Sequence, residues 1–156
     1  MGVENLNYDA ILSQIESRVD APWKDLFEFV VEKLAGIDRY NWVGIYVVRK
    51  GKLVLDSYRG EKTEHEVITV GAGLCGLAIT EDAVINERDV KGNALYLSCF
   101  PSTKSELVVP IRHGGKPIGE IDVDSDTINA FTREDENFLE KVSSMIGEKV
   151  FSRFEE

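Results

Sequence analysis

Cysteine and histidine are scarce in this sequence of 156 residues, which contains only two of each. Two histidines are too few for the usual zinc ligand sets, and Cys75 and Cys99 lack the C-x-x-C spacing of structural zinc sites. We therefore expect no metal. In a reducing compartment both cysteines would be thiols, so a functional pair would be catalytic or redox-sensing rather than structural.

Positive charge is also in deficit, with 18 Lys and Arg residues against 28 Asp and Glu residues and a net charge of −10. Such a surface repels phosphate backbones and anionic lipid, and no basic cluster overrides the average. Apolar runs of signal-peptide length at the N-terminus, or of the ~20 residues that span a membrane, are absent. We expect a cytoplasmic protein with neither nucleic-acid nor membrane partners, folded as a single domain over residues 1–156.

Helical spacing of apolar residues appears at both ends of the chain. Tyr8 to Val19 and a stripe from Trp23 to Leu34 predict two N-terminal helices over about 8–36, the second starting with Asp20 as a candidate N-cap. Thr132, with Asp135 three residues later, forms a capping box for a last helix over about 132–153. The segment between them, about 41–124, is the expected core of the sheet.

The central segment has the patterns of two hairpins, an isolated strand and a short helix. The long polar stretch from Glu87 to Ser105 has no clean period, which is typical of a functional loop. The order of elements predicts an α+β fold with an antiparallel sheet, its helices mainly on one face. The expected segments are strands 42–48, 53–55, 67–70, 107–111 and 117–124, and a helix from about 75 to 82.

Each cysteine, taken alone, is more often a small buried apolar residue than a reactive one. Cys75, however, lies between glycines at the expected start of the short helix, where unpaired N–H groups favour a thiolate. Cys99 lies in the long loop, where access is easy. Both are therefore candidates for chemistry.

Asp122 and Asp124 alternate with aliphatic residues, so their carboxylates face the same side of a strand. The ordinary interpretation is a solvated sheet face, but no lysine or arginine follows the pair, and a cationic ligand would neutralise it. Glu106 joins them only if the hairpin turn allows it. A two- or four-residue turn puts it opposite Val123, on the other face, whereas a three-residue turn puts it opposite Asp122.

Crowded carboxylates cannot all stay ionised, so one of this group would be protonated and could act as a general acid. Trp42 and Tyr46 are four residues apart on a strand and face one side of the sheet. Residues of the same type and spacing are ordinarily core aromatics.

Three motifs occur in a characteristic order: Gly71-Ala-Gly-Leu-Cys75-Gly76, then Cys99 seven residues before Glu106 in a Ser-Glu-Leu-Val-Val-Pro run, then Asp122-Val-Asp-Ser125. Together they resemble the GAF-domain enzymes called free methionine-(R)-sulfoxide reductases. The resemblance runs from about Asn41 to the C-terminal helix. It implies a GAF-like fold, with the long active-site loop on the sheet face opposite the helices.

The resemblance also implies roles. Cys99 matches the nucleophile, Cys75 the resolving cysteine and Glu106 the acid on the sulfoxide oxygen, with a sulfenic acid and an intramolecular disulfide as intermediates. The substrate would be free methionine sulfoxide and the reductant a thioredoxin-like dithiol, with no cofactor. Asp122 and Asp124 match the clamp on the amino group.

Trp42 and Tyr46 match the wall around the methyl sulfoxide. The sequence departs from the family in two places. A third cysteine, common about ten residues before the Gly-x-Cys-Gly turn, is absent, and Phe100 replaces an aspartate after the nucleophile. The alternative functions are a non-catalytic GAF sensor of a small ligand and a redox sensor. A homodimer is left open by the sequence.

Overall fold

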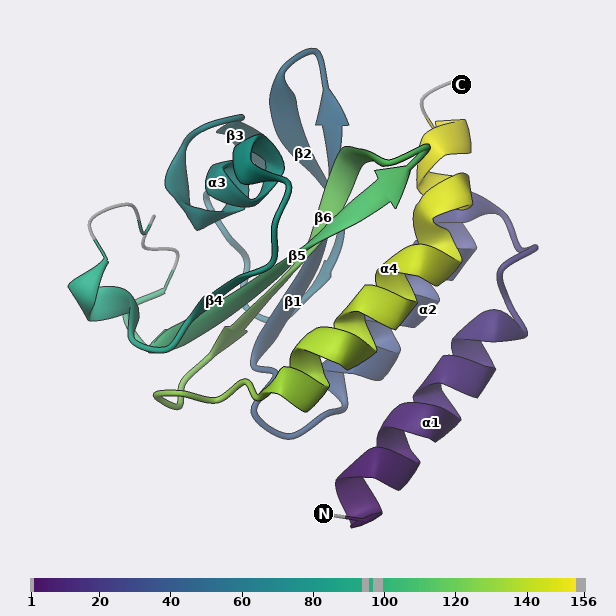
Figure 1. Ribbon diagram of the computed structural model, residues 1–156, viewed down its shortest axis with the longest axis horizontal. Helices are drawn as coiled ribbons and strands as arrows, with labels where there is room; N and C mark the ends of the chain where they lie inside the picture. Colours follow the sequence, from purple (N-terminus) through teal and green to yellow (C-terminus); the bar gives the residue numbers. More distant parts are fainter. Residues whose placement is uncertain (1, 94–95, 97–99, 154–156) are drawn as a thin grey trace.

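The protein consists of a six-stranded antiparallel sheet with helices on both faces, and the computed structural model describes residues 2–93, 96 and 100–153 (Figure 1). The strand order is β3-β2-β1-β6-β5-β4. Helices α1, α2 and α4 lie on one side of the sheet, and α3 lies on the other. The predicted α+β fold is confirmed. The elements are α1 Gly2–Glu16, α2 Trp23–Ala35, β1 Trp42–Arg49, β2 Lys52–Arg59, β3 Val67–Thr69, α3 Gly73–Glu81, β4 Ile85–Glu87, the 3₁₀ turn η1 Val90–Gly92, β5 Ser105–His113, β6 Lys116–Ser125 and α4 Arg133–Arg153.

Several boundaries differ from the prediction. Pro22, in an extended conformation with ψ of 147°, is the N-cap of α2, so the expectation that Asp20 caps this helix is wrong. Strand β2 continues to Arg59 through polar residues because it pairs with β1 along its length. Strand β4, which was not predicted, ends at Glu87, the first residue of the expected long loop, and forms by pairing with β5. Backbone pairing, rather than apolar pattern, determines these two strands.

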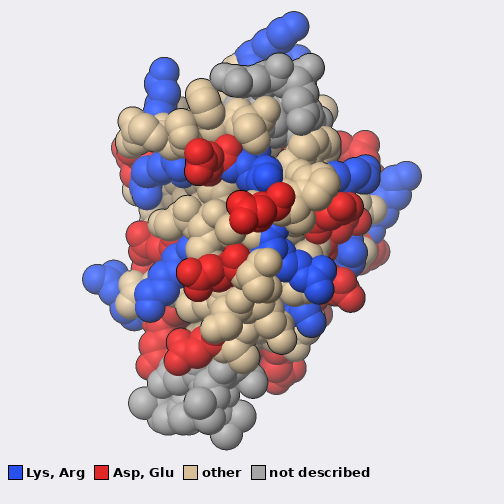
Figure 2. Space-filling view, turned by 90° about the vertical axis from the view of Figure 1, so that its right-hand side faces the viewer, with Lys and Arg blue, Asp and Glu red and all other residues tan. Residues whose placement is uncertain are grey.

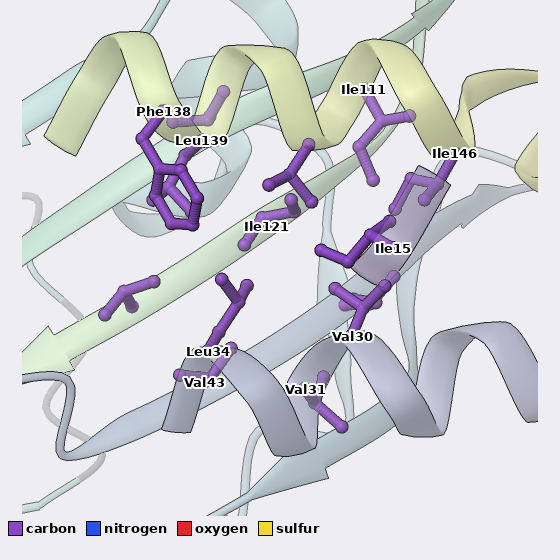
Figure 3. Close-up of a cluster of buried hydrophobic side chains, with 14 of the residues drawn as sticks. Ile15, Val30, Val31, Leu34, Val43, Ile111, Ile121, Phe138, Leu139 and Ile146 are labelled. Carbon is purple, nitrogen blue, oxygen red and sulfur yellow. The ribbon is translucent and has the colours of Figure 1, made fainter. Parts of the chain in front are cut away.

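The main hydrophobic core lies between the sheet and helices α1, α2 and α4 (Figure 3). Ile121 and Val123 of β6 are fully buried there. Leu34 of α2 and Leu139 of α4 come from the two helices that cover this part of the sheet. Because side chains alternate along a strand, the residues of β6 between these aliphatic positions must face the opposite side, towards α3.

Asp135 fixes the N-terminus of α4 and ties it to two other parts of the chain. Its carboxylate accepts hydrogen bonds from the Tyr8 and Tyr40 hydroxyls, both at 2.6 Å, and from the Thr132 N–H at 2.8 Å. The Asp135 N–H donates in return to the Thr132 hydroxyl at 3.4 Å. The predicted capping box is confirmed, and it also anchors α1 to α4.

The surface formed by the helices carries basic and acidic side chains interspersed with one another (Figure 2). On this face there is no continuous cationic area of the kind that binds nucleic acid. Within residues 2–93, 96 and 100–153, every helix is too short or too polar to cross a lipid bilayer.

We expect Thr132→Ala to lower the free energy of unfolding by about 1 kcal/mol, because the α4 N-terminus loses its side-chain cap. Urea denaturation measures the change. The control is Thr127→Ala, at an exposed position outside the capping box, which should change stability by less than about 0.5 kcal/mol. Equal effects from the two substitutions would show that the capping box contributes nothing.

Candidate functional site

The sheet face opposite the main core carries a row of acidic side chains on β6, which we call the acidic row. Strands β1 and β5 lie on either side of it. On β6 the row is Glu120, Asp122 and Asp124, all nearly or fully buried. The neighbouring strands place three residues on each side, directly opposite the row. They are Tyr46, Gly44 and Trp42 on β1, and Pro110, Val108 and Glu106 on β5.

The position of Glu106 was open between two hypotheses, and both assigned it the wrong partner. A two-residue turn was expected to place it opposite Val123, and a three-residue turn opposite Asp122. The structure has the two-residue turn, formed by Gly114 and Gly115 with φ values of 60° and 77°. Even so, Glu106 shares the face of the acidic row.

A β-bulge explains this outcome. The pairing of β6 with β5 jumps from Pro117 to Gly119, so Ile118 is an extra residue on β6. The extra residue shifts the register by one and places Glu106 opposite Asp124, because each one-residue shift exchanges the two faces of a strand. The bulge therefore brings the fourth carboxyl group into the site.

Cys75 covers this face from the first turn of α3, which begins at Gly73. A β-carbon at Gly76 would lie 2.5 Å from the backbone nitrogen of Gly71, so the preceding turn packs against the helix through glycine backbone alone. This packing directs the cysteine towards β6. Its Sγ donates to Asp122 Oδ2 at 3.3 Å and lies 3.9 Å from Glu106 Oε2.

Burial raises the pKa of the Cys75 thiol well above its ordinary value, and the charges of Asp122, Glu120 and Glu106 raise it further. The expectation that the helix start favours a thiolate at this position is therefore wrong. The N–H groups at a helix N-terminus carry only a fractional positive charge, which favours the thiolate weakly. Burial and three nearby carboxyl groups disfavour the thiolate more strongly. Cys75 is a protonated thiol in this environment.

The acidic row is electrostatically unusual. Burial raises the pKa of Asp122 and of Asp124, and hydrogen bonding with Glu106 offsets part of the shift at both. No ion pair to these two aspartates is found among the described residues. Within that part of the chain, Asp122 Oδ1 and Asp124 Oδ1 also lack a hydrogen-bond partner.

Glu120 was not among the predicted site residues. It is fully buried, and neither carboxyl oxygen has a hydrogen-bond partner among the described groups. Burial and the charge of Asp122 raise its pKa well above the ordinary value. The alternation that identified Asp122 and Asp124 extends back by two residues to Glu120, so the signal was present in the sequence.

Trp42 and Tyr46 flank the acidic row from β1, and the polar atoms of both side chains are hydrogen-bonded. The Trp42 indole N–H donates to the Glu61 carbonyl at 2.9 Å, and the Tyr46 hydroxyl donates to the His65 carbonyl at 2.7 Å. The Trp42 ring lies over Gly44, where a β-carbon would come within 2.3 Å of it. These contacts fix two aromatic walls beside the carboxyls.

Phe100 continues the wall, with its ring centre 6.1 Å from that of Trp42. Cys99, the predicted nucleophile, lies outside the described residues.

A pocket of about 100 Å³ opens beside Asp124 at this end of the row. Its lining is acidic and aromatic, formed by Asn41, Trp42, Glu61, Phe100, Ser102, Thr103, Asp124 and Asp126.

The donor atoms on this face could hold a cation. Cys75 Sγ and one carboxylate oxygen each from Glu106 and Asp122 all lie within 4.8 Å of one another. A thiol with carboxylates suits a borderline metal such as zinc, and the carboxylates also suit an organic ammonium group. The expectation that no metal is needed remains a prediction.

Comparisons with known proteins place this geometry in context. The profile of the GAF domain family matches residues 23–150. Free methionine-R-sulfoxide reductase of Escherichia coli is 30% identical over 148 residues, which cover 95% of this chain and 86% of that protein.

Two solved structures are similar in fold and sequence. The type II free methionine-R-sulfoxide reductase of Thermoplasma acidophilum is 42% identical, with a TM-score of 0.80 over 88% of this chain and 95% of the other. The free methionine-R-sulfoxide reductase of Neisseria meningitidis, solved in complex with its substrate, is 27% identical, with a TM-score of 0.87 over 95% of this chain and 90% of the other.

The raised pKa values predict a pH-dependent stability. The folded protein keeps protons on Asp122, Asp124 and Glu120 at pH values where the unfolded chain, with aspartate pKa near about 3.9, has lost them. Stability from these groups is present below the unfolded pKa and is lost as pH rises through the folded pKa. The free energy of unfolding should therefore fall as pH rises above about 4, until the pH passes the folded pKa values of these groups.

Asp124→Asn should make this fall shallower, by up to about 1.4 kcal/mol per pH unit, because one proton fewer is linked to unfolding. Urea denaturation at a series of pH values measures the slope. Asp126→Asn, which removes an exposed carboxylate two residues along, is the control and should keep most of the wild-type slope. Identical slopes for wild type and Asp124→Asn would contradict the assignment.

Proposed function

The chain belongs to the GAF domain family, and from this premise we propose that it is an enzyme that reduces free L-methionine-(R)-sulfoxide to methionine. Relatives named for this activity support the proposal, including the Escherichia coli protein and two of the similar structures. The observation that carries it is the buried acidic row beside two fixed aromatic rings, with no ion pair to Asp122 or Asp124 in the described part of the chain.

The α-ammonium group of a free amino acid would bind between Asp122 and Asp124. It brings a positive charge and three hydrogen-bond donors, and each aspartate has an oxygen without a partner among the described groups. Binding would therefore restore both aspartates to the ionised state. The acidic pocket beside Asp124 offers a route of entry.

The methyl sulfoxide end would lie between Trp42 and Tyr46. Both rings are held by hydrogen bonds to backbone carbonyls, so they would present fixed apolar surfaces to a methyl group. Glu106, opposite Asp124 and within reach of Cys75, would hold the proton for the sulfoxide oxygen. Four crowded carboxyls cannot all ionise, which favours a protonated member.

In the first step the Cys99 thiolate attacks the sulfoxide sulfur while Glu106 protonates its oxygen. The hydroxyl then passes from the substrate sulfur to Cys99: the substrate S–O bond and the transient bond between the two sulfurs break, an O–S bond to Cys99 forms, and methionine leaves with Cys99 as a sulfenic acid. The Cys75 thiol then attacks Cys99, forming the disulfide and releasing water. An external dithiol of the thioredoxin type reduces the disulfide and completes the cycle.

The protonated state of Cys75 supports the assignment of Cys99 as the nucleophile and Cys75 as the resolving cysteine. A nucleophile that starts the reaction must be a thiolate, and the raised pKa of Cys75 disfavours that form. A resolving cysteine needs to act only after the sulfenic acid has formed.

We expect Cys99→Ser to abolish methionine formation, whereas Cys75→Ser should still form about one methionine per active site in the absence of reductant. The reason is that only Cys99 would react with the sulfoxide, whereas Cys75 would act later. Quantifying methionine after mixing with excess sulfoxide measures both outcomes. Loss of this single turnover in both variants would remove the distinction between the two cysteines.

The proposed clamp also predicts substrate range. An N-acetyl group or a peptide bond removes the positive charge, so Asp122 and Asp124 lose their ion-pair partner, and removing one partner of a buried ion pair costs about 3–5 kcal/mol. We expect kcat/KM to fall by roughly 10²–10³-fold or more. The assay couples NADPH oxidation through thioredoxin reductase and thioredoxin.

The substrates to compare are free L-methionine-(R)-sulfoxide, its (S) epimer, the N-acetyl derivative and a short internal peptide. The free (R) epimer should be turned over and the other three hardly at all. Comparable kcat/KM for the free and the acetylated sulfoxide would refute the clamp, and no turnover of any substrate would refute the proposed function.

A further inference from the structure

Three possible ligand atoms from three separate elements meet beside the acidic row. They are the Cys75 sulfur from α3 and one carboxyl oxygen each from Glu106 on β5 and Asp122 on β6. We call them the donor set. Their side chains are only 5%, 6% and 3% exposed, respectively, so the surrounding packing holds the three atoms in place, as it would not on an open surface.

The spacing of the donor set fits tetrahedral coordination. Cys75 Sγ lies 3.3 Å from Asp122 Oδ2 and 3.9 Å from Glu106 Oε2. With Zn–S bonds of about 2.3 Å and Zn–O bonds of about 2.0–2.2 Å, a sulfur and an oxygen ligand on one tetrahedral ion are about 3.5–3.7 Å apart. The observed distances fall on either side of this value, so shifts of less than about 0.5 Å would complete the geometry.

The Asp122 carboxyl has an oxygen that is available to a further ligand. Its Oδ1 has no hydrogen-bond partner among the described residues, although the side chain is almost fully buried. Glu120, next along the same strand face, is fully buried, and within the described part of the chain both of its oxygens also lack a partner. Buried acceptors without donors cost free energy, and a bound cation would offset that cost.

We infer that the donor set is a zinc site, at which Zn²⁺ replaces the thiol proton of Cys75 and binds Cys75, Glu106 and Asp122. A water molecule would take the fourth tetrahedral position. In this exchange the S–H bond breaks, a Zn–S bond forms and the proton passes to solvent, with no atom oxidised or reduced. Binding of the ion stands on its own, whereas its effect on catalysis rests on the proposed function.

The types of donor atom select the metal. Ca²⁺ takes six to eight oxygen ligands, and Mg²⁺ requires an octahedron and usually keeps several of its waters. A thiolate with two carboxylates in tetrahedral arrangement suits zinc instead. Because its members come from α3, β5 and β6, the donor set has no compact spacing in the sequence of the kind that identifies structural zinc sites.

The pocket beside Asp124 gives a cation a route to the donor set. Three carboxylate residues, Glu61, Asp124 and Asp126, are part of its lining. Asp124 shares the strand face of Asp122 and lies directly opposite Glu106. Negative side chains along this route raise the local concentration of cations.

Zinc at the donor set would inhibit the proposed reaction at two points. It would occupy Asp122, which the substrate ammonium group needs. It would also hold the sulfur of Cys75, which must react with the sulfenic acid later in the cycle. The ion would therefore be a reversible inhibitor that competes with substrate, rather than a cofactor.

Zinc binding is tested on chelator-treated, reduced protein without substrate. Isothermal titration calorimetry with Zn²⁺ should give one ion per chain. Co²⁺ in its place should give a sulfur-to-cobalt charge-transfer band and the intense visible bands of tetrahedral cobalt. We expect Cys75→Ser and Asp122→Asn to weaken zinc binding by roughly 10²-fold or more, since even groups outside the ligand shell change metal affinity 10–100-fold. Cys75→Ser should also lose the charge-transfer band.

Two control variants locate the site. His113→Gln removes a histidine at the opposite end of β5 from Glu106, and Cys99→Ser removes the other thiol of the chain. Both should bind zinc as wild type does. Unchanged binding in Cys75→Ser, or loss of binding in either control, would overturn the site. Urea denaturation shows whether each variant is folded, and Glu106→Gln, which keeps the side-chain shape, replaces any donor-set variant that is not.

Single-turnover methionine formation separates this inference from the proposed function. In wild type without reductant, methionine formed from the free (R)-sulfoxide should fall in proportion to the fraction of sites that hold zinc, and a chelator should restore it. Zinc binding at the donor set of a protein that forms no methionine would refute the proposed function alone. Methionine formation that persists at saturating zinc would overturn the inhibition alone.

Discussion

Burial of a row of carboxyl groups on one face of the sheet is the constraint on which the rest of the structure depends. Glu120, Asp122 and Asp124 are nearly or fully buried, and no ion pair to them is found among the described residues. Burial therefore favours the protonated forms and raises the pKa of all three groups. The apolar residues between them on β6 pack against the helices on the opposite face, so one strand serves a stable core and a polar cavity at the same time.

The buried carboxyl groups also determine the reactivity of the Cys75 thiol. A thiol surrounded by carboxyls is protected from stray oxidants and electrophiles, because these react with thiolates. Its reactivity then depends on an event in its surroundings, such as the arrival of a cation or of an electrophilic sulfur. The glycine contact between Gly71 and Gly76 brings the thiol to this position without occupying space above the acidic row.

Much of the fold follows from sequence periodicity, whereas the site depends on details that periodicity does not contain. The helical stripes and the capping box at Thr132 and Asp135 were correctly predicted, as was the shared face of Asp122 and Asp124. The face of Glu106 depends on a bulge at Ile118. Pro117 and Gly119 on either side are residues typical of a bulge, but the turn length alone was used to predict the register. The protonated state of Cys75 arises from residues brought together from α3, β5 and β6. Glu120 was not predicted, although the alternation of acidic and aliphatic residues continues from the Asp-x-Asp pair back to this position.

The acidic row also acts as a check on folding. A slip of β6 by one residue would turn Glu120, Asp122 and Asp124 into the aliphatic layer beneath α2 and α4, and would bring Ile121 and Val123 out of it. Every pairing of this central strand that is shifted by an odd number of residues would then bury acids among leucine, isoleucine and valine side chains, at a cost of several kcal/mol for each group. Mispaired intermediates would be short-lived for this reason. The carboxyls that make the cavity polar thus also select which face of the strand turns away from the helices while the sheet assembles.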